Sequence, residues 1–142
     1  MSCATSLIVA YGNALRGDDG VGVRIGAICA AAGWNTIATT ALLPEHAEAI
    51  ARADRVIFVD CHVGLNAGEV AVVPIDAQQA TALRPASPAS LLALAKDLYG
   101  SSPRAHLIGV GPETLAYREG LSASVEQAIP RVLETIDLLL AS

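Results

Sequence analysis

Two adjacent carboxylates, Asp18 and Asp19, stand between glycines in the segment GNALRGDDGVG, which follows an apolar run at residues 7–11. An apolar strand, a glycine-rich turn and a helix start, in that order, are typical of a ligand-binding corner. Gly12 and Gly17 have P-loop spacing, but the two aspartates replace the Lys-Ser/Thr pair of a P-loop. Because two carboxylates repel phosphate, the charge of this segment excludes a phosphate-binding loop.

A third carboxylate, Asp60, ends the apolar run RVIFVD at residues 55–60. A charged residue at the C-terminal end of a buried strand projects into the crevice where open α/β sheets bind ligands. If the strands are neighbours, Asp19 and Asp60 converge, and they then need a cation, a shared proton or an arginine to coexist. A helix cap explains one aspartate of the tandem but not both. A divalent metal site, an acid/base pair, or both together fit these residues.

The histidines and cysteines add one candidate to this site. His62 lies two residues after Asp60 and points to the same side if the strand continues, although a lone histidine there is more often a hydrogen-bonded surface group. His46 is expected on a solvent-facing turn, and His106 begins a predicted strand. Cys61 and His62 are adjacent, so they face opposite sides of a strand and cannot act as a nucleophile–base pair.

Strand and helix patterns alternate along the chain. Strands are predicted at 7–11, 36–43, 55–60, 70–73 and 106–110, the fourth antiparallel at the sheet edge because a short connection precedes it. Helices are predicted at 20–32, from Pro44, from Ser87 to Gly100, and from Ser122, with Pro130 kinking the last helix or delaying its start. The pattern indicates a single α/β domain over residues 1–142. It has three layers, with a twisted, mostly parallel sheet of about five strands between helices.

Composition restricts the partners and the compartment. The net charge is −5 and no block of Lys or Arg occurs, which argues against nucleic acid or an anionic membrane as a partner. Three widely spaced cysteines without a CxxC pair fit a reducing cytoplasm. The uncharged stretch at 25–44 is interrupted by Gly33 and Asn35, so a buried helix followed by a strand explains it better than a membrane span.

Four segments resemble, in order, the motif blocks of the hydrogenase maturation endopeptidases, which process the large subunit of nickel–iron hydrogenases. GNALRGDDGVGVR (12–24) resembles their opening motif, and LLPEHAEAIARADRVIFVDCHVGLNAGEV (42–70) their second block. SPASLLALAKDLYG (87–100) is similar to the third block, and HLIGVGPETLAYREGLSASVEQAIPRVLETI (106–136) to the C-terminal one. The resemblance covers nearly the whole chain.

This resemblance implies a cytoplasmic protease that removes a short C-terminal extension from the hydrogenase large-subunit precursor after nickel insertion. Family members recognise the nickel carried by the substrate through two acidic residues and one histidine. By position, Asp19 matches the first acidic ligand and Asp60 the second, so both are expected to be catalytic and metal-binding; Asp18 belongs to the same motif. The expected partner is the precursor, with no nucleic acid and no membrane, and the expected state is a monomer.

The histidine of that set is missing, because alignment on Ser87-Pro88 puts Arg84 in its place. One hypothesis is that the Arg84 guanidinium neutralises Asp19 and Asp60; the alternative is a solvated loop residue. Beside Arg84, His62 is a candidate for the third position. Two functions follow: a peptidase, in which a carboxylate or a metal-polarised water attacks, or a catalytically impaired relative that binds or escorts the hydrogenase subunit. An unrelated small-molecule enzyme on an α/β scaffold is the third and least favoured reading.

Overall fold

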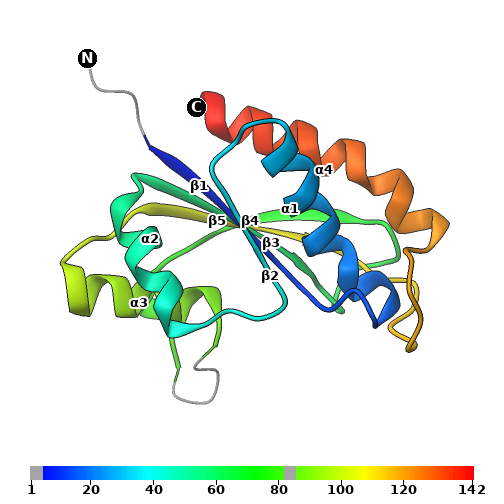
Figure 1. Ribbon diagram of the computed structural model, residues 1–142, viewed down its shortest axis with the longest axis horizontal. Coiled ribbons are helices and arrows are strands. Elements are labelled where there is room, and N and C mark those ends of the chain that lie inside the picture. Colours follow the sequence, from blue (N-terminus) through cyan, green and yellow to red (C-terminus); the bar gives the residue numbers. More distant parts are fainter. Residues whose placement is uncertain (1–4, 82–85) are drawn as a thin grey trace.

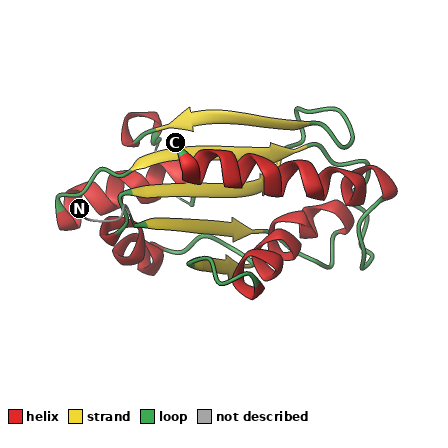
Figure 2. Ribbon diagram, turned by 90° about the horizontal axis from the view of Figure 1, so that it is seen from above, coloured by secondary structure: helices red, strands yellow, loops and turns green. Residues whose placement is uncertain are grey.

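The computed structural model describes residues 5–81 and 86–142, and a sheet runs through its centre (Figure 1). This sheet has five strands in the order β2-β1-β3-β5-β4. The strands are β1 (Ser6–Tyr11), β2 (Thr36–Thr39), β3 (Arg55–Cys61), β4 (Val70–Ile75) and β5 (Arg104–Val110). Four strands are parallel, while β4 pairs antiparallel with β5 at the edge (Figure 2). The predicted antiparallel edge strand is therefore confirmed.

Helices cover both faces of the sheet (Figure 1). On one face lie α1 (Val21–Ala31) and α4 (Ala123–Ala141), and on the other α2 (Ala47–Arg52) and α3 (Pro88–Tyr99). Three short 3-10 turns complete the description: η1 (Gly17–Gly20), η2 (Pro44–His46) and η3 (Ala77–Gln79). The predicted three-layer α/β fold with a mostly parallel sheet is confirmed.

The core explains why β1 and β3 are apolar in sequence without interruption. Alternate residues of a strand face opposite sides of the sheet, and helices cover both sides here. Thus Ile8 and Ile57 pack against α1 and α4, whereas Val9 and Phe58 pack against α2 and α3. All four side chains are buried. This double burial holds the ends of β1 and β3 side by side.

Two predicted boundaries differ from the structure. The second strand ends at Thr39 rather than residue 43, because the Thr39 hydroxyl bonds to the backbone of Ala41 and turns the chain. The last helix runs from Ala123 through Pro130, so a delayed start is wrong. Ser122 caps it as predicted, its hydroxyl accepting from the Val125 N–H at 3.4 Å. In the described ranges, no helix is long and apolar enough to cross a membrane.

Candidate active site

The loop between β1 and η1 is folded tightly onto the end of its own strand. A Cβ added to Gly12 would lie 2.0 Å from the carbonyl oxygen of Asp19, and one added to Gly22 would lie 2.1 Å from that of Tyr11. Only glycine permits both approaches. The loop is closed by the Asn13 N–H, which donates to the Asp19 carboxylate at 2.9 Å. The glycines therefore hold Asp19 directly beside the carboxyl end of β1.

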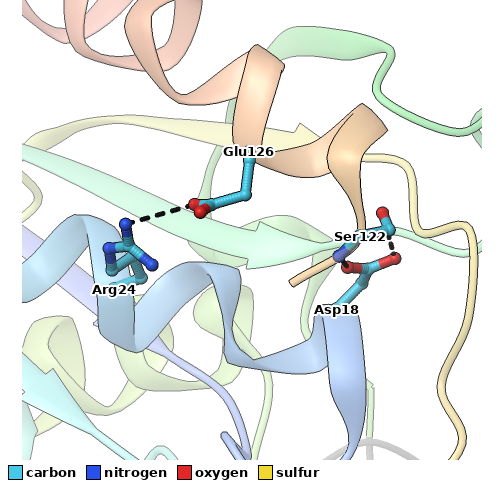
Figure 3. Close-up of polar contacts among 4 residues, drawn as sticks. All are labelled: Asp18, Arg24, Ser122 and Glu126. Atoms are coloured by element: carbon cyan, nitrogen blue, oxygen red, sulfur yellow. Dashed lines mark hydrogen bonds and ion pairs between the residues drawn. The ribbon is translucent and has the colours of Figure 1, made fainter. Parts of the chain in front are cut away.

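Asp18 faces the protein interior and is completely buried (Figure 3). Its carboxylate accepts hydrogen bonds from the N–H groups of Glu113 (2.8 Å), Thr114 (3.1 Å) and Ser122 (2.7 Å), and from the Ser122 hydroxyl (2.9 Å). Burial is the largest influence and on its own would raise the pKa of Asp18. The four donors outweigh it and hold that pKa below its ordinary value. Asp18 is thus an ionised anchor for the segment between β5 and α4.

A surface ion pair lies beside this anchor. Arg24 on α1 and Glu126 on α4 approach to 3.2 Å, and both side chains are about half exposed (Figure 3). Exposed pairs of this kind contribute little to stability because water and salt screen them. The buried Asp18 contacts are therefore the stronger connection between η1 and the start of α4.

Asp60 lies near the end of β3 and shares the carboxyl edge of the sheet with Asp19. Because β1 and β3 are adjacent and parallel, the convergence predicted for neighbouring strands is present. The pKa of Asp60 is raised to about 6, mainly by burial and in smaller part by the charge of Asp19; the Tyr11 hydroxyl, the Cys61 N–H and His62 act in the opposite direction. The structure therefore brings Asp19 and Asp60 within electrostatic range of each other.

His62 follows β3 directly and is exposed. Its backbone N–H donates to the Val110 carbonyl at 2.9 Å, which extends the β3–β5 pairing by one residue. Its side chain shares the carboxyl edge with Asp60 and its charge lowers the Asp60 pKa.

Cys61 packs against the core on the face of the sheet covered by α1 and α4. Burial raises the pKa of its thiol to about 12, with smaller contributions from nearby aspartates. The thiol is therefore protonated at neutral pH, in agreement with the exclusion of a Cys61–His62 nucleophile–base pair.

No group of three or more His, Cys, Asp and Glu side chains is arranged to hold a metal ion within residues 5–81 and 86–142. Arg84, the residue aligned with the missing family histidine, lies outside the described residues. The side chains described at this edge that can bind a metal ion are the carboxylates of Asp19 and Asp60 and the imidazole of His62.

Tyr11 is a site residue that sequence reasoning missed. It ends β1, and its hydroxyl hydrogen-bonds to the Asp60 carboxylate. One signal was available: a polar-tipped aromatic residue closes an otherwise apolar strand at the edge where ligands bind. The contact itself depends on strand register, which the sequence does not contain.

Large apolar side chains are exposed on four different loops at this edge of the sheet. They are Leu15 (58% exposed), Leu43 (44%), Val63 (73%) and Tyr117 (85%). Tyr117 also stacks under Arg16, whose Cζ lies 5.5 Å from the ring centroid. Other large apolar side chains are exposed on β4, α3 and α4, but these four come from loops that share one edge of the sheet. Exposed apolar side chains gathered at one site are typical of contact with another protein.

The architecture thus defines a class: a doubly wound α/β protein whose carboxylate pair lies at the carboxyl edge of its sheet. No protein-family model matches the chain, and no curated protein sequence matches it significantly. Solved structures do match.

The hydrogenase maturating endopeptidase HybD from E. coli superposes with a TM-score of 0.78 at 25% sequence identity, covering 96% of this chain and 92% of that one. The solution structure of the E. coli endopeptidase HycI gives 0.68 at 25% identity, over 92% and 87% of the two chains. The nickel–iron hydrogenase maturation protease HybD from Thermococcus kodakarensis shares the fold with a TM-score of 0.76 at 22% identity, over 96% and 99%. The resemblance indicated by the sequence motifs is therefore confirmed over nearly the full chain.

Proposed function

We propose that this protein is an endopeptidase that removes the C-terminal extension of a nickel–iron hydrogenase large-subunit precursor after nickel has been inserted. The supporting observation is the similarity of 96% of the chain to an endopeptidase of hydrogenase maturation, together with a carboxylate pair at the sheet edge. The precursor is the substrate, and nickel enters the site as part of it.

Electrostatics supports recognition of the nickel by Asp19 and Asp60. A buried carboxylate whose pKa is raised by burial and by a neighbouring carboxylate gains stability from a cation placed between the two. A precursor that carries nickel supplies this cation, whereas an empty precursor leaves the repulsion in place. The imidazole of His62 is at the same edge and imidazole nitrogen is a suitable ligand for nickel, but the three side chains are not arranged to hold a metal ion in the free protein. Selection for the loaded precursor follows from this arrangement.

The burial of Asp60, which raises its pKa, also gives this residue a chemical role. A carboxyl group with a pKa of about 6 exchanges a proton readily near neutral pH, as a general base must. In the proposed reaction, Asp60 accepts a proton from a water molecule as the water oxygen attacks the scissile carbonyl carbon. The carbon–nitrogen bond then breaks, and the leaving amine receives the proton. Asp19 faces the nickel during these steps.

The surface around the site suits a folded protein substrate rather than a small molecule. Leu15, Leu43, Val63 and Tyr117 surround the carboxyl edge from four loops and present apolar area to the solvent. Burying such side chains on docking favours association. We further propose that the enzyme acts in the cytoplasm, because the chain's cysteines are unpaired where described, as in a reducing compartment. We also propose that it acts as a monomer that meets one partner briefly.

The test uses the purified full chain and a nickel-loaded large-subunit precursor. Mass spectrometry of the precursor measures loss of its C-terminal peptide over time. We expect wild type to cleave the loaded precursor and to leave the empty precursor intact. Asp19→Asn and Asp60→Asn should each slow cleavage by at least about a hundredfold, the effect of removing a charged group used in the chemical step.

Asp137→Asn is the matched control, because Asp137 is an exposed carboxylate on α4. It should cleave like wild type. Cleavage that survives both site substitutions contradicts the assigned residues. Tight binding of the precursor without any cleavage, converted to cleavage by Arg84→His, indicates an escort protein instead of a peptidase.

A further inference from the structure

Tyr11 occupies the position on β1 that faces Asp60. The register pairs Ala10 with Val59, so Tyr11 and Asp60 are the next two residues along these neighbouring parallel strands. Both are half-buried, and the Tyr11 ring packs against the core under α2 and α3, next to Val9. The ring is therefore held by packing, and its hydroxyl reaches Asp60.

The phenolic hydroxyl donates to the Asp60 carboxylate, which also accepts from the Cys61 backbone N–H. These two donors hold the Asp60 side chain in place against electrostatic repulsion by the Asp19 carboxylate. Asp60 is half-buried and is the last residue but one of β3. Without the hydroxyl, repulsion favours a rotamer that turns Asp60 away from Asp19.

We propose that Tyr11 is a positioning residue, whose hydroxyl fixes the Asp60 carboxylate in the orientation that faces Asp19 and the incoming substrate. This inference rests on the proposed function for its catalytic consequence. Packing alone is the competing role, since a phenylalanine ring fills the same space. The two roles differ in a single oxygen atom, so one substitution separates them.

Tyr11→Phe keeps the ring and removes the hydroxyl. With nickel-loaded precursor, we expect kcat to fall about ten- to a hundredfold, the loss associated with one hydrogen bond to a charged group, while KM stays within about twofold. The melting temperature should stay close to that of wild type because the core contacts of the ring remain. Tyr99→Phe is the matched control, because Tyr99 ends α3, is 52% exposed and is not part of the proposed docking surface.

Crystal structures of wild type and Tyr11→Phe provide a measurement that does not need activity. We expect the Asp60 carboxylate to lie within hydrogen-bonding distance of the Tyr11 hydroxyl in wild type and to adopt a different rotamer in the variant. An unchanged Asp60 rotamer, or an unchanged kcat in Tyr11→Phe, overturns the positioning role. If wild type itself cleaves no precursor, the proposed function fails, and the comparison of the two crystal structures still decides the role of Tyr11.

Discussion

Asp18 and Ser122, which are 104 residues apart in the chain, are joined by two hydrogen bonds, one to each carboxylate oxygen. The Ser122 N–H donates to Oδ1 at 2.7 Å and its hydroxyl to Oδ2 at 2.9 Å. The same hydroxyl caps α4. Asp18 therefore connects the start of α1 to the start of α4, while its neighbour Asp19 faces the site. The tandem aspartates have separate structural and chemical tasks.

Asp18→Ala should lower the free energy of unfolding by about 3–5 kcal/mol. The substitution leaves one buried and two partly buried N–H groups without an acceptor. It also removes hydrogen bonds to a charged group, each worth about 1.5–3 kcal/mol. Urea denaturation measures the effect. Asp54→Ala is the control, because Asp54 accepts one exposed hydrogen bond from the Thr5 N–H, and it should cost less than about 1 kcal/mol. Equal losses in the two variants would show that Asp18 is not an anchor.

Asp60 should make the nickel-free protein less stable as the pH rises. Burial raises its pKa to about 6 from an ordinary value of 3.8, so the folded state binds the proton more tightly than the unfolded chain does. The free energy of unfolding contributed by this group therefore falls between about pH 4 and pH 6 and is level above that. A shift of this size corresponds to roughly 3 kcal/mol.

Asp60→Asn cannot ionise and should remove this dependence. At pH 7 the variant should be more stable than wild type by an amount on the order of 2–3 kcal/mol, and near pH 4 the difference should be small. Urea unfolding of both proteins at pH 4, 5, 6 and 7 with a chelator measures it. The depressed pKa of Asp18 acts on both proteins alike and cancels in the comparison. A difference that is constant over this range contradicts the raised pKa.

The arrangement of β1 and β3 could be predicted from sequence because both are apolar on two faces, which only the middle of a covered sheet accommodates. That placed Asp19 and Asp60 at one edge. The different tasks of Asp18 and Asp19 could not be predicted, since the donors to Asp18 are mainly backbone N–H groups 95 to 104 residues away, and every residue except proline carries such a group. The Tyr11 contact was missed for a related reason, because strand register is set by packing.

Gly12→Ala should be far more damaging than Gly33→Ala. Both glycines have positive φ, so both substitutions carry a backbone cost of about 1–2 kcal/mol. An added Cβ at Gly33 meets no atom within 4 Å, whereas one at Gly12 lies 2.0 Å from the Asp19 carbonyl oxygen. Gly12→Ala must therefore displace the loop that holds Asp19 and should lose precursor cleavage as well as stability. Similar melting temperatures for the two variants would rule out the close approach at Gly12.

Exposed apolar residues at the site edge should affect substrate binding but not the chemical step. Val63→Ser removes a side chain that is 73% exposed in the free protein. If the precursor buries it, its loss should raise KM about five- to tenfold and leave kcat unchanged, as expected when an interaction equally strong in the ground state and the transition state is lost.

Leu138→Ser is the matched control, since Leu138 is 65% exposed near the C-terminal end of α4, remote from the carboxyl edge. Steady-state cleavage of nickel-loaded precursor measures both constants. The end of α4 lies away from the carboxyl edge because it is beside the first residue of β3, where Arg55 donates to the Ser142 carbonyl at 2.9 Å. A KM that rises equally in the two variants would therefore place the docking surface elsewhere.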